Sequence, residues 1–135
     1  MKHAKLAFSI ICDDVRIEMG NKLSFMGVFE NIFLPSFPSA LVKFEIVNHW
    51  QGVGPFETQV KILNPDRREV VASVPSKFSI ETHGYADNIT FFTNVAFDRA
   101  GEFAVQTFLD GKVVNERPLY VHHVPANAPG SHTVH

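Results

Sequence analysis

Asn88-Ile-Thr-Phe-Phe-Thr-Asn-Val-Ala-Phe97 is the first of three runs of strand-forming residues that decide the fold class. The other two runs follow it up to position 122. Asp110-Gly111 separates the second run from the third. An Asp-Gly pair between two such runs is typical of a β-hairpin, because the two-residue turn needs positive φ and glycine adopts it without steric cost. Residues on one side of the second run are Phe103, Val105, Thr107 and Leu109. The three runs predict the closing strands of an antiparallel sandwich.

The rest of the chain repeats this pattern at short intervals, with turn residues between the runs and no useful window of helical periodicity. Strands are expected at residues 5–12, 22–33, 41–50, 55–63, 68–74, 77–83, 88–98, 101–109 and 112–122. About eight or nine strands at this spacing predict an all-β fold, a two-sheet antiparallel immunoglobulin-like sandwich. We expect one domain over residues 1–123, followed by a flexible tail over 124–135 that has nothing to bury.

Composition limits the function. A net charge of −2 gives no electrostatic case for nucleic acid or an anionic membrane as a partner. Cys12 is the single cysteine of the chain, so an intrachain disulfide is excluded and a reducing, cytoplasmic location is expected. No apolar run reaches the 18 or more residues needed to span a bilayer.

Cys12-Asp13-Asp14 is the sharpest polar cluster. A thiol and two carboxylates at a strand end could hold a metal, or one carboxylate could act as a base. However, consecutive side chains of a strand point to opposite faces, so the two carboxylates converge only if the chain turns there. The favoured interpretation is structural: Cys12 continues the face of Leu6, Phe8 and Ile10 into the core, and the aspartates form a turn. No metal, cofactor or catalytic residue is predicted.

Histidine and aromatic residues offer weaker candidates. His122 and His123 follow the last strand and diverge in an extended segment, and the tail carries His132 and His135. His49-Trp50 and His83-Gly84-Tyr85 end two strands and could meet at one pole of the sandwich, either as ordinary packing or as a shallow ligand site. A carbohydrate- or peptide-binding module would require Trp50 and Tyr85 to be exposed together there.

An apolar outer face is the feature least easily explained by packing alone. If Phe91 and the residues in phase with it face the core, then Phe92 points outward, and by the same alternation Phe108 leaves the core face. The candidate interface residues are Phe92, Phe108, Val114 and Tyr120. Several exposed aromatic residues on neighbouring strands are typical of a partner-binding patch, although a one-residue bulge would return any of them to the core.

The chain contains three motifs in order: Ile10-Ile-Cys-Asp-Asp-Val15, Gly20-Asn-Lys-Leu-Ser-Phe-Met-Gly-Val28 and Pro35-Ser-Phe-Pro38. Together they resemble the motifs of a family of small bacterial proteins of unknown function. The resemblance continues through the later Gly-Pro-Phe-Glu, Asn-Pro-Asp and Gly-Glu-Phe segments and covers most of the chain. It implies a single sandwich domain and a bacterial origin, and it implies no activity.

These observations favour a non-catalytic cytoplasmic domain whose outer sheet face pairs with itself, for instance as a homodimer, or with another protein. The rival hypothesis is a small metal-assisted enzyme that uses Asp13 and Asp14 with one or more of His49, His83 and His122. That enzyme requires the side chains to lie within about 5 Å of a common point, given metal–ligand bonds near 2 Å.

Overall fold

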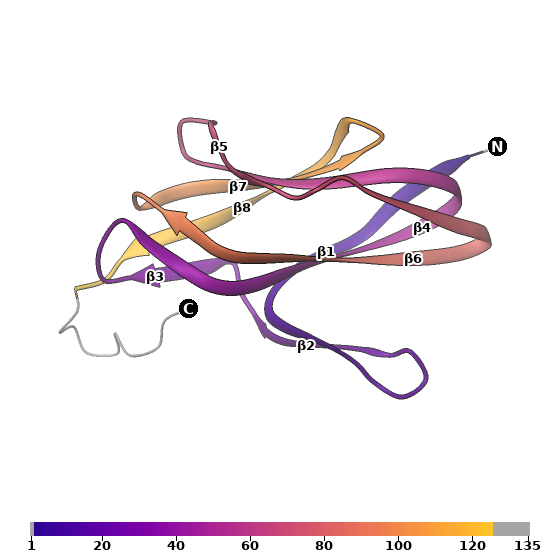
Figure 1. Cartoon of the computed structure of the whole chain (residues 1–135), viewed down its shortest axis with the longest axis horizontal. Helices are drawn as coiled ribbons and strands as arrows, with labels where there is room; N and C mark the ends of the chain where they lie inside the picture. Colours follow the sequence, from indigo (N-terminus) through magenta and orange to yellow (C-terminus); the bar gives the residue numbers. More distant parts are fainter. Residues whose placement is uncertain (1, 126–135) are drawn as a thin grey trace.

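The computed structural model describes residues 2–125, apart from the side chain of His83, and in that part it consists of strands without any helix (Figure 1). This confirms the all-β class. The tail histidines at positions 132 and 135 lie outside the described residues. The strands are β1 (His3–Ile17), β2 (Leu23–Val28), β3 (Asn31–Leu34), β4 (Ser39–Leu63), β5 (Glu69–Ala72), β6 (Ser76–Phe97), β7 (Gly101–Leu109) and β8 (Lys112–His123).

Three of these strands are longer than predicted: β1 continues beyond residue 12 to Ile17, and β4 and β6 each join a pair of predicted strands. Predicted strands 41–50 and 55–63 form the single strand β4, and 77–83 with 88–98 form β6. The turn expected between the halves of β4 is instead a bend at Gly52 and Gly54, whose φ angles are 152° and 119°. Glycine tolerates these angles, so β4 changes direction without leaving the sheet. Predicted strand 22–33 is split into β2 and β3.

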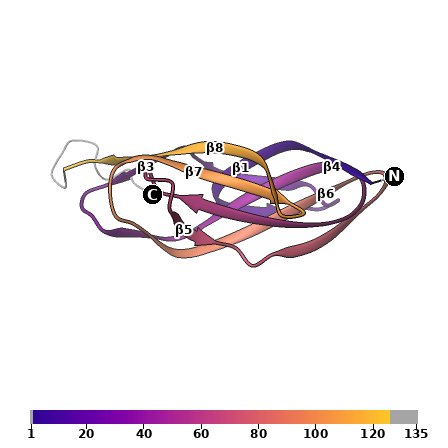
Figure 2. The same ribbon diagram turned by 90° about the horizontal axis from the view of Figure 1, so that it is seen from above.

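The bent β4 curls the whole sheet. Its first part lies between β1 and β6, and its last part lies between β7 and β5, within the order β2-β1-β4-β7-β8-β3. Side chains from both parts, such as Phe44 and Ile62, share one buried cluster with Phe103 of β7 and Leu119 of β8. Figure 2 shows β7 and β8 on one side of this core and β6 on the other. The sheet therefore wraps around its own hydrophobic core.

One strand pair corrects the antiparallel prediction. β3 runs parallel to β8, with Asn31 opposite Tyr120 and Leu34 opposite His123. Residues 35–38, which include two prolines, then lead from this edge to β4. Parallel strands need a long connection, and here the connection from β3 to β8 is most of the chain. The sheet is mixed.

The predicted orientation of Phe92 is wrong. Phe92 is 3% exposed and packs in the core, whereas Phe91 is 64% exposed. Asn94 has φ 53°, in the left-handed region, and this residue breaks the strict two-residue alternation of β6. Val95 and Phe92, three positions apart, both face inward as a result. Counting every second residue through Asn94 therefore places Phe91 in the core and Phe92 in solvent, which is the reverse of the observed arrangement.

A similar shift changes the prediction for β1. The pairing of β1 with β4 shifts between Leu6 and Phe8, so Ile11 enters the core and Phe8 is 38% exposed. Cys12 is fully buried, as expected, but it follows Ile11 and lies on the opposite, outer side of the strand. The expected core face is therefore wrong for Phe8, Ile10 and Cys12, which follow the shift, whereas Leu6 packs against the core cluster of Trp50.

The hairpin of β1 and β2 covers part of this outer side. In the register of the hairpin Phe25 lies opposite Val15, about 23 Å along β1 from Phe8, yet the Phe8 and Phe25 ring centres are 6.2 Å apart. The hairpin must therefore double back, and it does so at Gly27, whose φ is 66°. In Figure 1 the hairpin, made of β2 and the end of β1, forms a ribbon separate from the rest of β1, β4 and β6.

Phe103 supports a direct test of the core. It is fully buried and in edge-to-face contact with Phe97. We expect Phe103→Ala to lose about 3–5 kcal/mol of unfolding free energy, through lost transfer energy and an unfilled cavity. Gln106 lies on the outer side of the same strand, so Gln106→Ala should lower the unfolding free energy by less than about 0.5 kcal/mol. Equal denaturant midpoints for the two variants would contradict this register.

Gly27 supports a test of the hairpin bend. A Cβ at this position would collide with the carboxylate of Asp13, whereas a Cβ at Gly20, φ 77°, would meet nothing within 4 Å. Both substitutions to alanine carry the cost of a positive φ, on the order of 1 kcal/mol. We expect Gly27→Ala to lower the denaturant midpoint clearly more than Gly20→Ala, and equal midpoints would mean that the hairpin does not close at Asp13.

Candidate functional site

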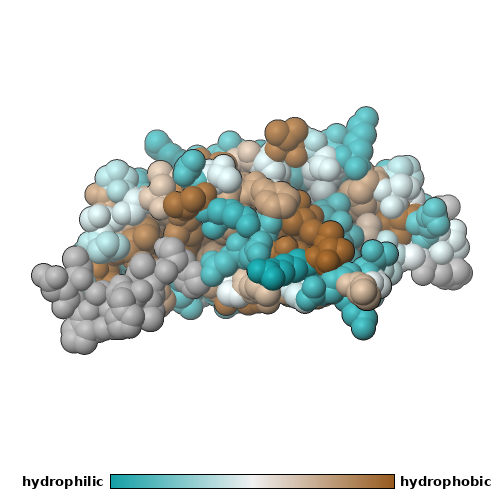
Figure 3. All heavy atoms as spheres, turned by 60° about the horizontal axis from the view of Figure 1, so that its bottom comes forward, coloured by the Kyte–Doolittle hydropathy of each residue, from teal (hydrophilic) through white to brown (hydrophobic). Residues whose placement is uncertain are grey.

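The candidate site is the outer face of β1, β4 and β6. Strand pairing places Val28, Cys12, Glu45 and Phe91 in one row across four strands, and Phe8, His49 and Asp87 in another. The centre of the first row is buried, since Cys12 and Glu45 are at most 1% exposed, while its ends are open. Figure 3 shows this side of the molecule, where hydrophobic patches are separated by hydrophilic residues.

His49 is the most elaborately held side chain on this face. Its Nδ1 lies 2.6 Å from Oδ1 of Asp87 on the neighbouring strand. Phe8 stacks on the imidazole with ring centres 4.8 Å apart and planes 3° from parallel, and the Tyr85 ring centre is 5.2 Å away. The carboxylate and the two aromatic rings fix the orientation of the imidazole, as carboxylate partners do for functional histidines.

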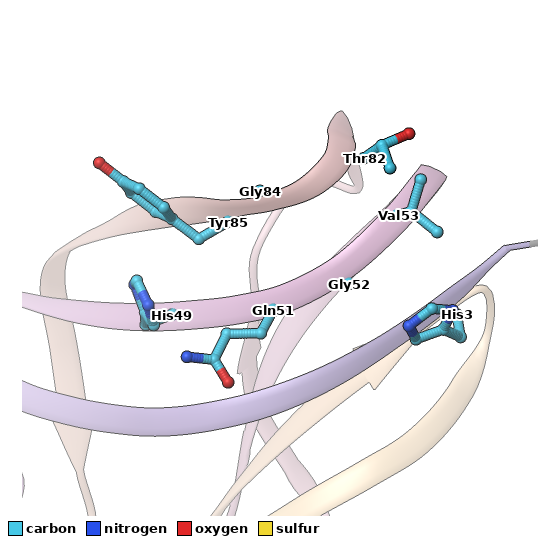
Figure 4. A pocket seen from close by; sticks show the side chains of 8 residues that line it. All are labelled: His3, His49, Gln51, Gly52, Val53, Thr82, Gly84 and Tyr85. Atoms are coloured by element: carbon cyan, nitrogen blue, oxygen red, sulfur yellow. The ribbon is translucent and has the colours of Figure 1, made fainter.

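A shallow groove of about 540 Å³ opens beside His49 at the bend of β4 (Figure 4). Glycine at position 52 allows the close approach, because a Cβ there would collide with the carbonyl oxygen of His3. The groove offers imidazole, amide and hydroxyl groups beside an exposed aromatic ring, which can hydrogen-bond and stack. Its lining residues are His3, His49, Gln51, Gly52, Val53, Thr82, Gly84 and Tyr85.

The predicted Cys12-Asp13-Asp14 cluster is divided by the structure. Burial, and then the negative charge of Glu45, raises the pKa of the Cys12 thiol, which keeps it protonated and a poor nucleophile. Asp14 binds Lys43 Nζ at 3.0 Å, and this hydrogen bond lowers the pKa of its carboxyl. Asp13 lies against Gly27 at the hairpin bend. The cluster thus has structural contacts, but the expected turn is wrong, because β1 continues through both aspartates to Ile17.

The metal-site geometry required by the rival hypothesis is not met in the described part of the chain. His49 lies opposite Phe8, six positions before Asp14, and His122 Nε2 lies 2.8 Å from Asn31 Oδ1 at the β3–β8 edge. Within residues 2–125, no three His, Cys, Asp or Glu side chains are grouped as metal ligands could be. The side chain of His83 lies outside the described set.

Trp50 is buried rather than exposed. It is 1% exposed, packs with Phe56 and Ile80 in a second core cluster, and donates its indole N–H to Asn88 Oδ1 at 2.7 Å. The pairing of His49 and Tyr85 at one end of the sheet was predicted, but an exposed platform of Trp50 with Tyr85 is wrong. Trp50 follows His49 and therefore points inward.

The other predicted interface residues do not form one patch. Phe108 is half-buried under the ammonium of Lys61, 4.9 Å from the ring centre, and Tyr120 is half-buried opposite Glu102. Six positions of β7, about 20 Å, separate Glu102 from Phe108. Val114 is 47% exposed near Phe108. Sequence reasoning missed Asp87 and Phe91, which only the cross-strand register brings to the face of His49.

The fold and this geometry define a small all-β protein, in which residues 2–125 form no familiar catalytic constellation. The chain belongs to a family of unknown function, DUF6941, whose model matches residues 7–122. This confirms the resemblance derived from the motifs at residues 10–15, 20–28 and 35–38. No sequence among the curated proteins matches the chain.

Solved structures show likeness in fold alone. A β-glucosidase from Listeria innocua in complex with isofagomine matches with TM-score 0.57 and 9% identity over 92% of this chain and 17% of the enzyme. The chain therefore spans about a sixth of that protein. An immunoglobulin-like protein from Pseudomonas aeruginosa matches with TM-score 0.40 and 10% identity over 89% of this chain and 97% of its own.

The Asp14–Lys43 pair gives a pH test of the site. The pKa of the Asp14 carboxyl is lowered, so the pair persists on acidification until the pH falls through that lowered value. We expect Lys43→Met to raise the pKa of Asp14 toward its ordinary value in a carbon-13 NMR titration. Asp110, whose pKa is lowered by Lys2, should titrate unchanged in the same variant. An unshifted Asp14 would contradict the pairing.

Proposed function

We propose that this chain is a non-catalytic interaction module that associates with itself or with another protein through the outer face of β1, β4 and β6. The observation that carries the proposal is the exposure of aromatic rings on β1 and β6, the two strands that flank β4 on that face. Phe91 is 64% exposed, Tyr85 60% and Phe8 38%. Exposed aromatic side chains are enriched where proteins bind one another. These three are spread along the face, since Phe91 and Tyr85 are six positions of β6, about 20 Å, apart.

The polar groups of this face support binding more than catalysis. The Cys12 thiol is buried with a raised pKa, and the Asp14 carboxylate is held by Lys43. The His49 imidazole has Asp87 on one nitrogen and aromatic rings beside it.

Residues 2–125 contain no helix that is long and apolar enough to cross a membrane. A cytoplasmic location stays a prediction from the cysteine content.

A finer description of the fold belongs to the same proposal. We infer an immunoglobulin-like sandwich, with β1, β4 and β6 in one layer and β7 and β8 in the other. The shared core of Phe44, Ile62 and Phe103 supports this description, because these side chains come from both parts of the curled sheet.

Binding of a small polar ligand in the groove is the second candidate function. The fixed imidazole of His49 and the exposed ring of Tyr85 favour it, since a few convergent polar groups beside an aromatic ring are typical of ligand sites.

Analytical ultracentrifugation of the full chain tests the leading proposal. We expect concentration-dependent association, or co-sedimentation with a purified partner, that Phe91→Asp abolishes because a desolvated carboxylate is costly in an apolar contact. Val113→Asp is the matched control, because Val113 is 48% exposed but lies in the β7–β8 hairpin. Loss of association in both variants, or in neither, would contradict the proposed face.

A further inference from the structure

The free edge of β6 is the longest unprotected backbone edge in the described part of the chain. β6 pairs with β4 alone, so along residues 84–93, before the left-handed Asn94, every second residue directs its N–H and C=O away from the sheet. These residues contain no lysine, arginine or proline, and Asp87 is their single charged residue. Such unprotected edges are templates for another strand.

Of the other edge strands, β2 has six residues and bends at Gly27, and β3 and β5 are shorter still. β3 has four residues and is followed by Pro35 and Pro38. β5 also has four residues and is followed by Pro75. Short edge strands and nearby prolines are the usual means of preventing strand addition. The contrast singles out β6.

A groove follows this edge at its centre. It has a volume of about 460 Å³, with residues 89–93 of β6 on one side and residues 71–74 with Ser76 on the other. None of the lining residues is charged. Phe91, 64% exposed, is the middle residue of the β6 side, and Val74, 85% exposed, belongs to the opposite wall. The groove therefore fits an extended, uncharged segment.

We infer that the occupant is β6 of a second copy of this chain, paired antiparallel about a two-fold axis at Phe91. This inference rests on the proposed function and names its partner and geometry. In this register Phe91 lies opposite Phe91 of the other copy, and the pairing covers residues 89–93 of both copies, so that it ends before the left-handed Asn94. The two Asp87 charges are then about 27 Å apart along the strands, so like charges do not meet. An isologous pair of this kind closes as a dimer.

A cysteine cross-link tests the register. Residues directly opposite in antiparallel strands have Cα atoms about 4.5–5.5 Å apart, within the range that a disulfide spans. We expect Phe91→Cys to give a covalent dimer on mild oxidation of the full chain, and Val113→Cys to stay uncross-linked. Cys12 lies two strands from Phe91, roughly 10 Å away, which is too far for a disulfide within one copy.

Hydrogen exchange provides the second readout. Amide exchange within residues 89–93 should slow as the concentration of the unmodified protein rises, because the outward N–H groups become bonded. Suppose that Phe91→Asp abolishes association but that neither the cross-link nor the slower exchange is observed. This result would overturn strand pairing and leave the proposed function standing. A monomer that binds a different protein would also overturn it, whereas a monomer that binds no protein would overturn both.

Discussion

The pairing of β4 on both sides of its bend, with a register shift against β6 between Gly52 and Gly54, is the constraint on which the rest of the structure depends. This strand pairs with β1 and then β7 on one side, and with β6 and then β5 on the other. Gly52 and Gly54 let it turn without losing its neighbours, because their backbone angles are ones that other residues rarely adopt. Both parts of β4 then contribute side chains to the same core. The curl of the sheet and the groove at the bend follow from this one strand.

The outer face of β1, β4 and β6 combines a covered centre with open ends. Val47 and Glu45 are buried there although they point away from the main core, and the hairpin that bends at Gly27 approaches the same side. Glu45 Oε2 accepts no hydrogen bond from the described residues, and a buried polar atom of this kind is costly. Phe91 and Tyr85 remain exposed at the rim. A face built in this way has the apolar surface for association without an evident reaction centre.

The candidate site could be predicted only in part. The proximity of His49 and Tyr85 was anticipated from predicted strand ends, although both residues lie inside the long strands β4 and β6. The separation of Asp13 from Asp14 followed from the divergence of consecutive side chains. The predicted orientations of Phe91 and Phe92 were the reverse of the observed ones, because alternation carries no information about the left-handed residue at Asn94. Asp87 could not be connected to His49, since the two are 38 positions apart and meet through cross-strand register.

The sequence by itself determined the all-β class, the hairpin at Asp110 and Gly111, the family, and the burial of Phe103, because period-two alternation and turn residues are local signals. Only the tertiary structure decided the bend of β4, the parallel pairing of β3 with β8, and which of two adjacent phenylalanines faces solvent. A single left-handed residue or shifted pair inverts every side chain beyond it, and its position is set by strands that are distant in the chain. The exposed edge of β6 is likewise a property of what pairs with it, which no local pattern records.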